Sequence, residues 1–335
     1  MIDANAVWAH LDSLAKPVRS LGALEALAVQ LAVAQQRLDP RTHPRRIVLF
    51  AADHGVVARG VSAWPSAVTG LMVGTIMAGR ATSNALAAAQ RCDLRLVDAG
   101  VQSPPPGPYP SFFAAAPVAP GTADLASGPA MTEGQFDAAW AVGASEAQRA
   151  LDEGYPLLIA GEMGIGNTTS AACLTALLAG APVSLAVGRG AGADDATLAV
   201  KTELVERASA HAIQLLPDQP RAAIASVSGF EIVAMAGFFA TGAAGGATLL
   251  LDGYVATAAA LIAERLAPGT ARSMIAAHRS AEPGHGAALA TLGLEPVLDW
   301  QMRLGEGTGA LVALPLLDSA AALLRDVARL ADLGV

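Results

Sequence analysis

The sequence predicts an α/β fold: a parallel, Rossmann-like sheet flanked by helices, with a small helical subdomain from the N- and C-terminal segments. Seven short apolar runs recur along the 335 residues, each ends at glycine or a polar residue, and helical stretches separate them. Such runs are typical of strands buried on both faces, as in parallel sheets, whose ligands bind beyond the carboxyl ends of the strands. The expected strands are 46–50, 94–97, 157–160, 183–187, 222–227, 249–251 and 273–277.

The two ends of the chain lack such runs and instead carry apolar residues at helical spacing. One stripe covers 21–38 and the other covers 311–333. We therefore expect residues 1–40 and 311–335 to pack together as the small helical subdomain. Residues 41–310 then form the large α/β domain.

Two segments depart from the repeating pattern. Residues 232–251 carry no charge and are long enough to span a bilayer, but the glycine-rich stretch 241–246 interrupts them. We interpret them as a buried helix, a turn and a buried strand, and expect no membrane contact. Residues 102–132 are dense in proline and glycine without periodicity, which predicts a long surface loop.

Composition restricts the class of protein. Hydrophobic residues make up 53% and charged residues 15% of the chain, which permits a large core and argues against disorder. The net charge of −8, with no basic block, argues against nucleic acid as a partner. Cys92 and Cys173 are too few for a disulfide framework or a metal cluster, so both are expected in the core. The first residues show no signal-peptide pattern, and we expect a reducing, cytoplasmic compartment.

The segment 161–169 is the strongest sign of a ligand site. It follows the apolar run 155–160 and leads into a predicted helix over 170–180 that glycine ends. The free N–H groups and the dipole of a helix N-terminus attract anions, and glycines let a ligand approach the backbone. We expect a phosphate or nucleotide site formed by Gly164, Ile165, Gly166, Asn167 and Thr168.

Two glutamates accompany glycine-rich segments. Glu162 does not suit an anion, so it indicates a ligand with a phosphate at one end and developing positive charge at the other. The alternative is that Glu162 orders its own loop by accepting backbone N–H bonds. Glu306 lies between glycines in 303–309, where spacing alone favours a solvated loop residue near a helix N-terminus, with Thr308 as the cap.

Eight sequence motifs, taken in their order along the chain, resemble those of the nicotinate-nucleotide–dimethylbenzimidazole phosphoribosyltransferase family. One block alone would be weak evidence, whereas the ordered set is highly specific. The blocks are 52–56, 60–65 with 68–69, 161–169, 188–190 with Lys201, 229–231, 251–253, 278–284 and 302–309.

This resemblance implies transfer of phosphoribose from nicotinate mononucleotide to 5,6-dimethylbenzimidazole, giving α-ribazole 5′-phosphate and nicotinate with inversion at C1′. It implies that Glu306 is the general base for the azole proton and that Glu162 stabilises positive charge at the ribose. The leaving pyridine nitrogen is already cationic and departs neutral, so no metal and no cofactor are expected. Asp194 and Asp195 are interpreted as a helix start instead of metal ligands.

The resemblance also implies phosphate contacts away from the helix start. Lys201 and Ser280 are expected to touch the phosphate, whereas the alternatives are a surface lysine and a solvated loop. The family is a homodimer with shared active sites, and 278–284 is a candidate contribution from the neighbouring subunit. The full set of these expected contacts is Gly188, Arg189, Gly190, Lys201 and Ser280.

The pocket for the acceptor base is expected to have aromatic and thioether walls, which flat heterocycles prefer. Many relatives have tyrosine in place of Trp64, and some have glutamine in place of Met72. These differences leave open another acceptor, such as adenine, a simpler benzimidazole or a phenol. A core tryptophan is the alternative for Trp64, and a catalytically silent nucleotide-binding module is the alternative for the chain. The expected lining residues are Ser62, Trp64, Pro65, Met72, Met163 and Leu304.

Four further polar residues are expected to have supporting roles at most. Asp53 and His54 follow the first strand, and we interpret them as a structural, hydrogen-bonded pair. Glu231 and Asp252 lie at element ends that face the same edge of the sheet.

Overall fold

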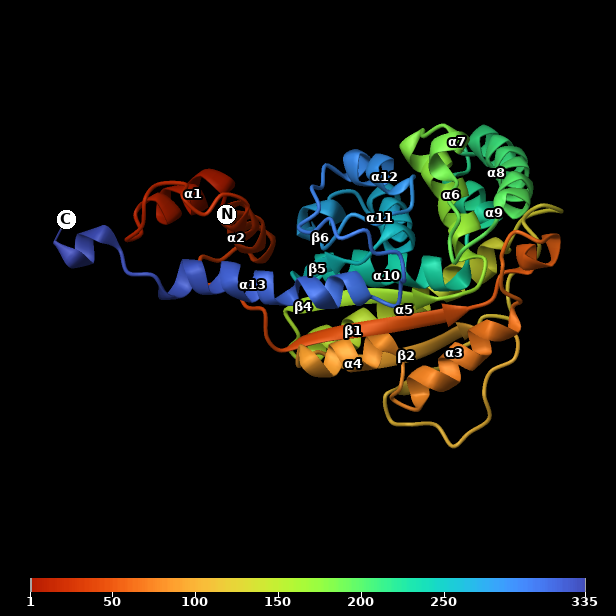
Figure 1. The fold of residues 1–335 in the computed structure, drawn as a ribbon, viewed down its shortest axis with the longest axis horizontal. Coiled ribbons are helices and arrows are strands. Elements are labelled where there is room, and N and C mark those ends of the chain that lie inside the picture. The colour runs from red at the N-terminus through yellow and green to blue at the C-terminus, as the bar shows by residue number, and fades with distance from the viewer. Residues whose placement is uncertain (1, 335) are drawn as a thin grey trace.

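A six-stranded parallel sheet forms the centre of the molecule, in a computed structural model that describes residues 2–334 (Figure 1). The strand order is β3-β2-β1-β4-β5-β6, and each neighbouring pair is parallel. This confirms the predicted fold class. The strands are β1 Arg45–Ala52, β2 Asp93–Gly100, β3 Phe113–Ala115, β4 Leu157–Met163, β5 Thr248–Leu251 and β6 Met274–Ala276.

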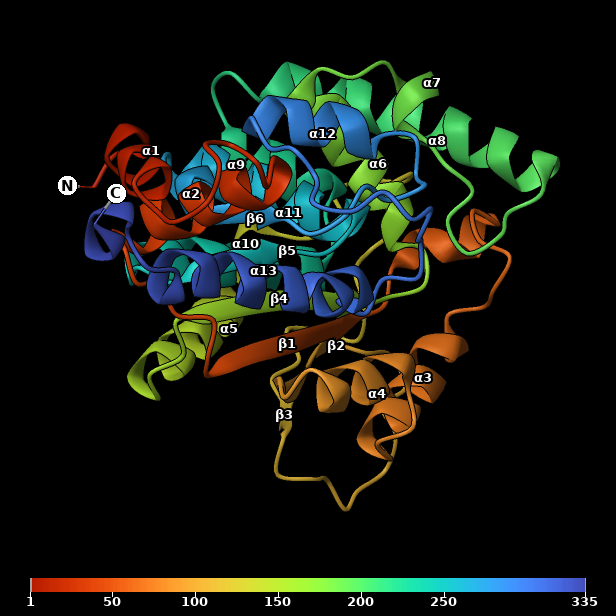
Figure 2. The same cartoon turned by 60° about the vertical axis from the view of Figure 1, so that its left-hand side comes forward.

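Helices cover both faces of this sheet (Figure 2). The α-helices are α1 Ala4–Asp12, α2 Ala23–Gln35, α3 Ala67–Met77, α4 Thr82–Ala89, α5 Glu133–Asp152, α6 Asn167–Ala179, α7 Val183–Ala186, α8 Asp195–Leu215, α9 Pro220–Val227, α10 Phe230–Ala244, α11 Tyr254–Leu266, α12 His285–Leu292 and α13 Thr308–Asp326. Short 3-10 helices are η1 Gly55–Arg59, η2 Thr270–Ser273 and η3 Leu330–Leu333.

Alternate residues of the central strand enter two different hydrophobic clusters. Val48 and Phe50 of β1 pack in the cluster that contains α5, α6 and α10. Ile47 and Leu49 pack in the cluster that contains α2, α4 and α13. All four side chains are fully buried, because successive strand residues point to opposite faces and both faces are covered.

The strand order reverses between β1 and β4. The chain builds β1, β2 and β3 towards one edge, and then returns to β4, β5 and β6 on the other side of β1. The loops that follow β1 and β4 therefore leave the sheet in opposite directions and open a crevice at its carboxyl edge. Ligands of open parallel sheets bind in such a crevice.

Two of the seven expected strands are wrong. Residues 183–186 form the short helix α7, and residues 222–227 lie in helix α9. Pro220 at the first helical position of α9 is a helix-start signal, which the apolar run concealed. The expected loop 102–132 contains the short strand β3 at the edge of the sheet, where its side chains are only partly buried.

The other segment predictions agree with the structure. Residues 232–251 form most of α10, a turn and β5, as expected. Helix α6 ends at Gly180 in a left-handed conformation, and Asp194 caps α8 by accepting a hydrogen bond from Thr197 N at 2.8 Å. Cys92 and Cys173 are buried, free cysteines.

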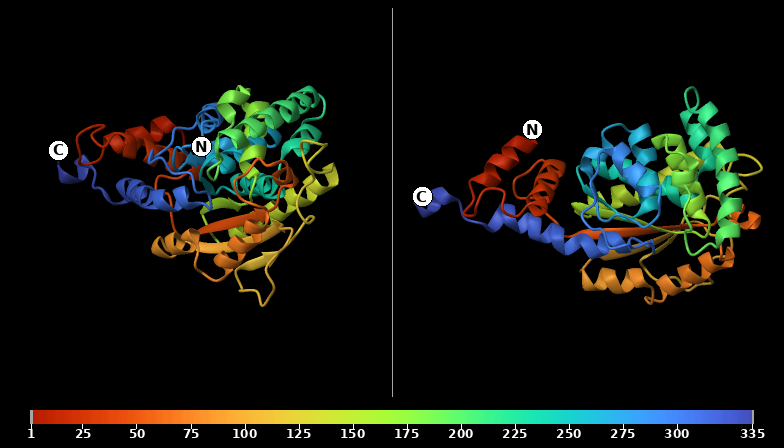
Figure 3. Two further views of the ribbon diagram at one scale, coloured as in Figure 1. Left: turned by 45° about the vertical axis from the view of Figure 1, so that its right-hand side comes forward. Right: turned by 45° about the horizontal axis from the view of Figure 1, so that its top comes forward.

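The terminal helices meet on one side of the molecule. In Figure 3, α1 and α2 lie beside the distal half of α13, and Leu14 forms a bridge with Arg329. Helix α13 is the one described helix long and apolar enough to cross a membrane, but 61% of that stretch is buried inside the protein, as in a core helix. The division into residues 1–40 with 311–335 and residues 41–310 stays a prediction.

Candidate active site

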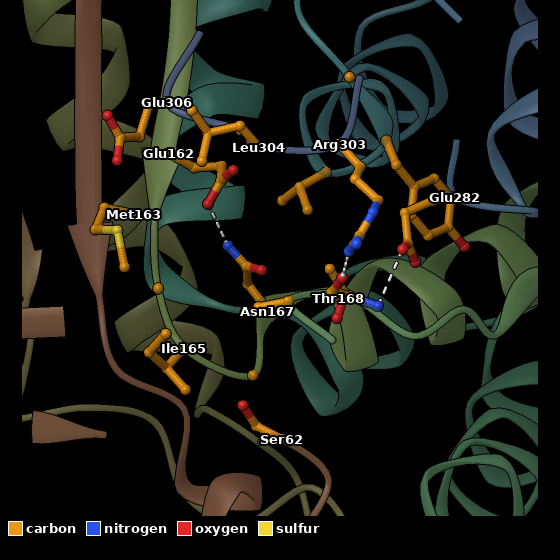
Figure 4. Close-up of a pocket in the computed structure, with 18 of the residues that line it drawn as sticks. Ser62, Glu162, Met163, Ile165, Asn167, Thr168, Glu282, Arg303, Leu304 and Glu306 are labelled. Atoms are coloured by element: carbon orange, nitrogen blue, oxygen red, sulfur yellow. Dashed lines mark hydrogen bonds between the residues drawn. The ribbon is translucent and has the colours of Figure 1, made fainter. Parts of the chain in front are cut away.

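A cavity of about 510 Å³ opens at the carboxyl edge of the sheet, where the strand order reverses (Figure 4). Its size suits a small molecule. Figure 4 shows Glu162 and Glu306 on one side of the cavity, and Arg303 and Glu282 on the other. The lining segments are 61–64, 162–168, 189–191, 252–256 and 303–306, with Val68, Met72, His278, Ser280 and Glu282.

The expected anion loop connects β4 to α6 and lines this cavity. Gly166 is the N-cap of α6 with φ of 93°, and no side chain caps this end of the helix. A side chain at Gly164 would place its Cβ 2.6 Å from Ala52 O, and one at Gly166 would meet Val57 at the same distance. Glycine is therefore required at both positions. All five residues that the sequence placed at this site, from 164 to 168, line the cavity.

Glu162 is at the end of β4, next to the anion loop. Its Oε2 accepts a short hydrogen bond from the side-chain amide of Asn167. The alternative in which Glu162 accepts backbone N–H bonds is therefore wrong. Burial, followed by the charges of Asp252 and Glu231, raises the pKa of Glu162 to about 8.

Glu306 is buried, with 5% of its surface exposed, so the expectation of a solvated loop residue is wrong. It has a φ of 56° between two glycines that also have positive φ, and this turn directs its side chain into the protein. Its Oε2 accepts hydrogen bonds from Ser83 Oγ at 3.0 Å and Ser83 N at 3.4 Å. Thr308 is not the helix cap, since the N-cap of α13 is Gly307.

Asp252 anchors the loop that carries Glu306. Its Oδ1 accepts hydrogen bonds from Gly309 N at 2.7 Å and Ala310 N at 3.2 Å, and its Oδ2 accepts one from Gly307 N at 3.1 Å. A carboxylate thus binds the first N–H groups of α13, where the helix dipole favours negative charge. Asp252 also lines the cavity itself.

Lys201 connects two loops beneath the cavity. Its Nζ donates hydrogen bonds to Thr168 Oγ1 at 2.8 Å and to Gly188 O at 2.9 Å. The side chain is 1% exposed, so the surface-lysine alternative is wrong, and burial lowers its pKa to about 8. Neither Lys201 nor Gly188 lines the cavity, and their contact with a phosphate stays a prediction.

The loop at 188–190 is held by side chains of the protein. Gly190 N donates to Glu282 Oε1 at 2.9 Å, and Arg303 Nη1 donates to Gly190 O at 2.7 Å. Arg189 lines the cavity, but its guanidinium bonds Ala193 O at 2.8 Å and Asp195. The amide of Gly190, expected to face a phosphate, thus donates to a carboxylate.

The cavity residues to which the sequence analysis gave no role include three with charged or titratable side chains. Arg303 and Glu282 lie inside recognised blocks, but their loops meet only through the fold. His278 also lines the cavity, and its Nε2 is 3.7 Å from Asp252 Oδ1. Burial lowers the pKa of His278, but the neighbouring carboxylate of Asp252 outweighs burial and raises it above its usual value. Ser280, which was expected, is buried and lines the cavity of its own chain.

The expected base pocket is mostly assembled. Its members that line the cavity are Ser62, Trp64, Met72, Met163 and Leu304. Pro65 does not line it. Trp64 is 51% exposed and its Nε1 donates to Ala191 O at 3.3 Å, so the alternative of a core tryptophan is wrong. Leu304 is also largely exposed at the rim.

Asp53 and His54 do not pair with each other. His54 Nε2 lies 2.6 Å from Glu231 Oε1, and both side chains are buried. Asp53 Oδ2 accepts a hydrogen bond from Gln102 N at 2.8 Å. The expectation of structural roles fits these contacts, but the expected partner is wrong.

Comparison with known proteins identifies the class of protein that carries this fold and cavity. A family model described as "Phosphoribosyltransferase" matches residues 3–335. The chain is therefore an enzyme of the phosphoribosyltransferase class and acts on small molecules.

Relatives and solved structures agree on the particular family. A nicotinate-nucleotide–dimethylbenzimidazole phosphoribosyltransferase of Mycobacterium tuberculosis is 47% identical over 98% of this chain and 91% of its own length. The enzyme of that name from Thermus thermophilus is 46% identical over 94% of this chain and 93% of its own length. The crystal structure of CobT from Thermus thermophilus has a TM-score of 0.93 at 45% identity, covering 98% of both chains. The chain belongs to the nicotinate-nucleotide–dimethylbenzimidazole phosphoribosyltransferase family, as the ordered motifs predicted.

Proposed function

We propose that the enzyme transfers the phosphoribosyl group of nicotinate mononucleotide to 5,6-dimethylbenzimidazole, giving α-ribazole 5′-phosphate and nicotinate. The observation that supports this most directly is the content of one cavity: an uncapped helix N-terminus, the partly buried Glu162 and the buried Glu306. The names of the relatives supply the two substrates.

The donor phosphate is proposed to bind at the N-terminus of α6. No side chain caps this end of the helix, the residues from Gly164 to Thr168 line the cavity, and Arg303 and Ser280 line the same cavity. Lys201 is proposed to hold the walls of this site together through Thr168 and Gly188. These hydrogen bonds use two of the three donors of the Lys201 ammonium group, so a direct contact with the phosphate would use the third.

Glu162 is proposed to stabilise the positive charge that develops at C1′ and the ring oxygen. Because burial raises its pKa to about 8, Glu162 is protonated at neutral pH in the free enzyme. The cationic pyridinium of bound donor favours the ionised carboxylate, so donor binding is expected to release a proton from Glu162. The charged carboxylate then faces the ribose when it is needed.

Glu306 is proposed as the general base. One nitrogen of the acceptor attacks C1′ from the face opposite nicotinate, and the bond between C1′ and the pyridine nitrogen breaks with its electron pair on that nitrogen. The second acceptor nitrogen loses its proton to Glu306. The configuration at C1′ therefore inverts from β to α, and the ring nitrogen of nicotinate departs neutral, so that no metal ion is needed.

We further propose a homodimer with shared active sites in a reducing cytoplasm. Exposed apolar side chains at the rim of the cavity, Trp64 and Leu304, support a partner surface there.

The test is incubation with nicotinate mononucleotide and 5,6-dimethylbenzimidazole, with chromatographic detection of nicotinate and NMR assignment of the product anomer. The proposal expects stoichiometric nicotinate and an α-linked product. A β-linked product would exclude direct inversion, and no nicotinate release would favour the catalytically silent module. Parallel assays with adenine, benzimidazole and phenol decide the acceptor, since the apolar wall of Trp64, Met72 and Met163 does not favour one of them by hydrogen bonding.

A further inference from the structure

The carboxylate of Glu306 is held from one side only. In the part of the chain that the structure describes, the hydrogen-bond donors to this carboxylate all belong to Ser83, and both act on Oε2. Oε1 receives no hydrogen bond from the described residues, while Glu306 lines the cavity. One oxygen is thus fixed in the protein and the other remains available to a ligand.

Ser83 is well placed for this contact. It is fully buried and is the second residue of α4, a helix that packs beside α13. The helix start is fixed independently, because Asn84 Oδ1 accepts a hydrogen bond from Ala81 N at 3.0 Å. The free N–H groups and the positive end of the dipole of α4 therefore point towards the Glu306 carboxylate.

We propose that Ser83 is a positioning residue for the reaction: it fixes the orientation of Glu306, so that Oε1 faces the acceptor. This inference depends on the proposed role of Glu306 as general base. A carboxylate that acts as a base only accepts hydrogen bonds, so Ser83 Oγ must donate to Oε2. A hydroxyl and an amide that both donate to one oxygen hold the carboxylate in one orientation.

The other charged groups of the cavity do not fix Glu306. Glu162 at the end of β4, Asp252 after β5 and His278 after β6 line the same cavity, and His278 lies against Asp252. Arg303, three residues before Glu306, also lines it, but its Nη1 donates to Gly190 O at 2.7 Å. Helix α4 itself contains no titratable residue, and Arg80 before it is exposed. Among the described residues, Ser83 at the start of α4 thus holds the Glu306 carboxylate.

The experiment measures kcat and KM for the acceptor in four enzymes: wild type, Ser83→Ala, Ser83→Thr and Thr82→Ala. Thr82 is the exposed neighbour of Ser83 on the same helix and serves as the matched control. We expect S83A to lower kcat about tenfold while KM for the acceptor changes little, because a Glu306 carboxylate that is no longer fixed points less often at the acceptor proton. S83T, which keeps the hydroxyl, and T82A should follow wild type.

A double-mutant cycle with Glu306→Gln separates positioning from a general loss of structure. If Ser83 acts through Glu306, S83A has no further effect in the E306Q background. An equal loss in both backgrounds, or a wild-type kcat for S83A, would overturn the inference alone. An E306Q enzyme with undiminished activity would instead refute the role of Glu306 as general base, and with it the role of Ser83. Thermal unfolding of each variant establishes that it is folded at the assay temperature, and the cycle stays informative if S83T does not fold.

Discussion

The raised pKa of Glu162 leads to a quantitative prediction about stability. In the native enzyme it holds its proton up to about pH 8, whereas its usual pKa of 4.5 applies once the chain unfolds. Between these two values the unfolded state loses a proton that the native state keeps. The native state of the wild-type enzyme therefore loses stability as pH rises from about 4.5 to 8, and Glu162→Gln removes this loss because glutamine cannot ionise.

The size of the effect follows from the same pKa values. At about 1.4 kcal/mol per pH unit, the full difference corresponds to an upper limit of about 5 kcal/mol. Glu162 lines a cavity that admits water, and neighbouring carboxylates readjust their protons, so we expect ~1–3 kcal/mol. The amide of Asn167 can still donate to the glutamine oxygen, so the local hydrogen bond is kept.

The assay is urea unfolding of wild type and E162Q, followed by circular dichroism, at unit steps from pH 5 to 9. The free energy of unfolding of E162Q should equal that of wild type near pH 5 and exceed it by ~1–3 kcal/mol at pH 8–9. The exposed Glu203 on α8 provides the control. The free energy of unfolding of Glu203→Gln should differ from that of wild type by an amount that does not change with pH. A constant difference between E162Q and wild type across this range would refute the raised pKa.

Three other variants test separate parts of the site. Gly161→Ala would place a Cβ 2.6 Å from Gly307 N, so we expect the Glu306 loop to shift. The expected result is a kcat at least tenfold lower and a free energy of unfolding reduced by ~1–3 kcal/mol. Wild-type kinetics would show that this close contact does not position the base. Lys201→Met removes the hydrogen bonds that join two phosphate-side loops, so KM for nicotinate mononucleotide should rise about tenfold while KM for the acceptor changes little. Equal changes in both constants would contradict this assignment. Trp64→Ala should raise KM for the acceptor by about fivefold at nearly constant kcat, as steady-state kinetics can check, and an unchanged KM would remove Trp64 from the base pocket.

Local patterns predicted the elements that are strongly specified by their own residues. The strands β1, β2, β4, β5 and β6 are apolar runs that end at polar or glycine residues, and parallel strands buried on both faces have that pattern. The same pattern misled at 183–187 and 222–227, because helices of four and eight residues are too short for their apolar residues to show a period that distinguishes them from strands. Strand β3 has only three residues and lies at an edge, so its pairing depends on β2 more than on its own sequence.

The candidate site likewise contains residues that local sequence predicted and residues that it did not. The loop from Gly164 to Thr168 was predictable, since a strand, glycines and a helix start follow one another in the sequence. The environment of Glu306 was not, because glycine neighbours suggest exposure while helix α4, more than 200 residues away in sequence, buries its carboxylate. Lys201 and Arg303 likewise take their partners from distant loops. Such contacts depend on the assembled sheet and leave no local signal.

The most direct test of the account is the turnover of Glu306→Gln with both substrates at saturation. The substitution keeps the size of the side chain and a hydrogen-bond acceptor for Ser83, but removes the ability to take the acceptor proton. The account predicts that kcat falls at least about 100-fold while the affinity for nicotinate mononucleotide stays near that of wild type. A kcat within about threefold of wild type would contradict the assignment of Glu306 as the base.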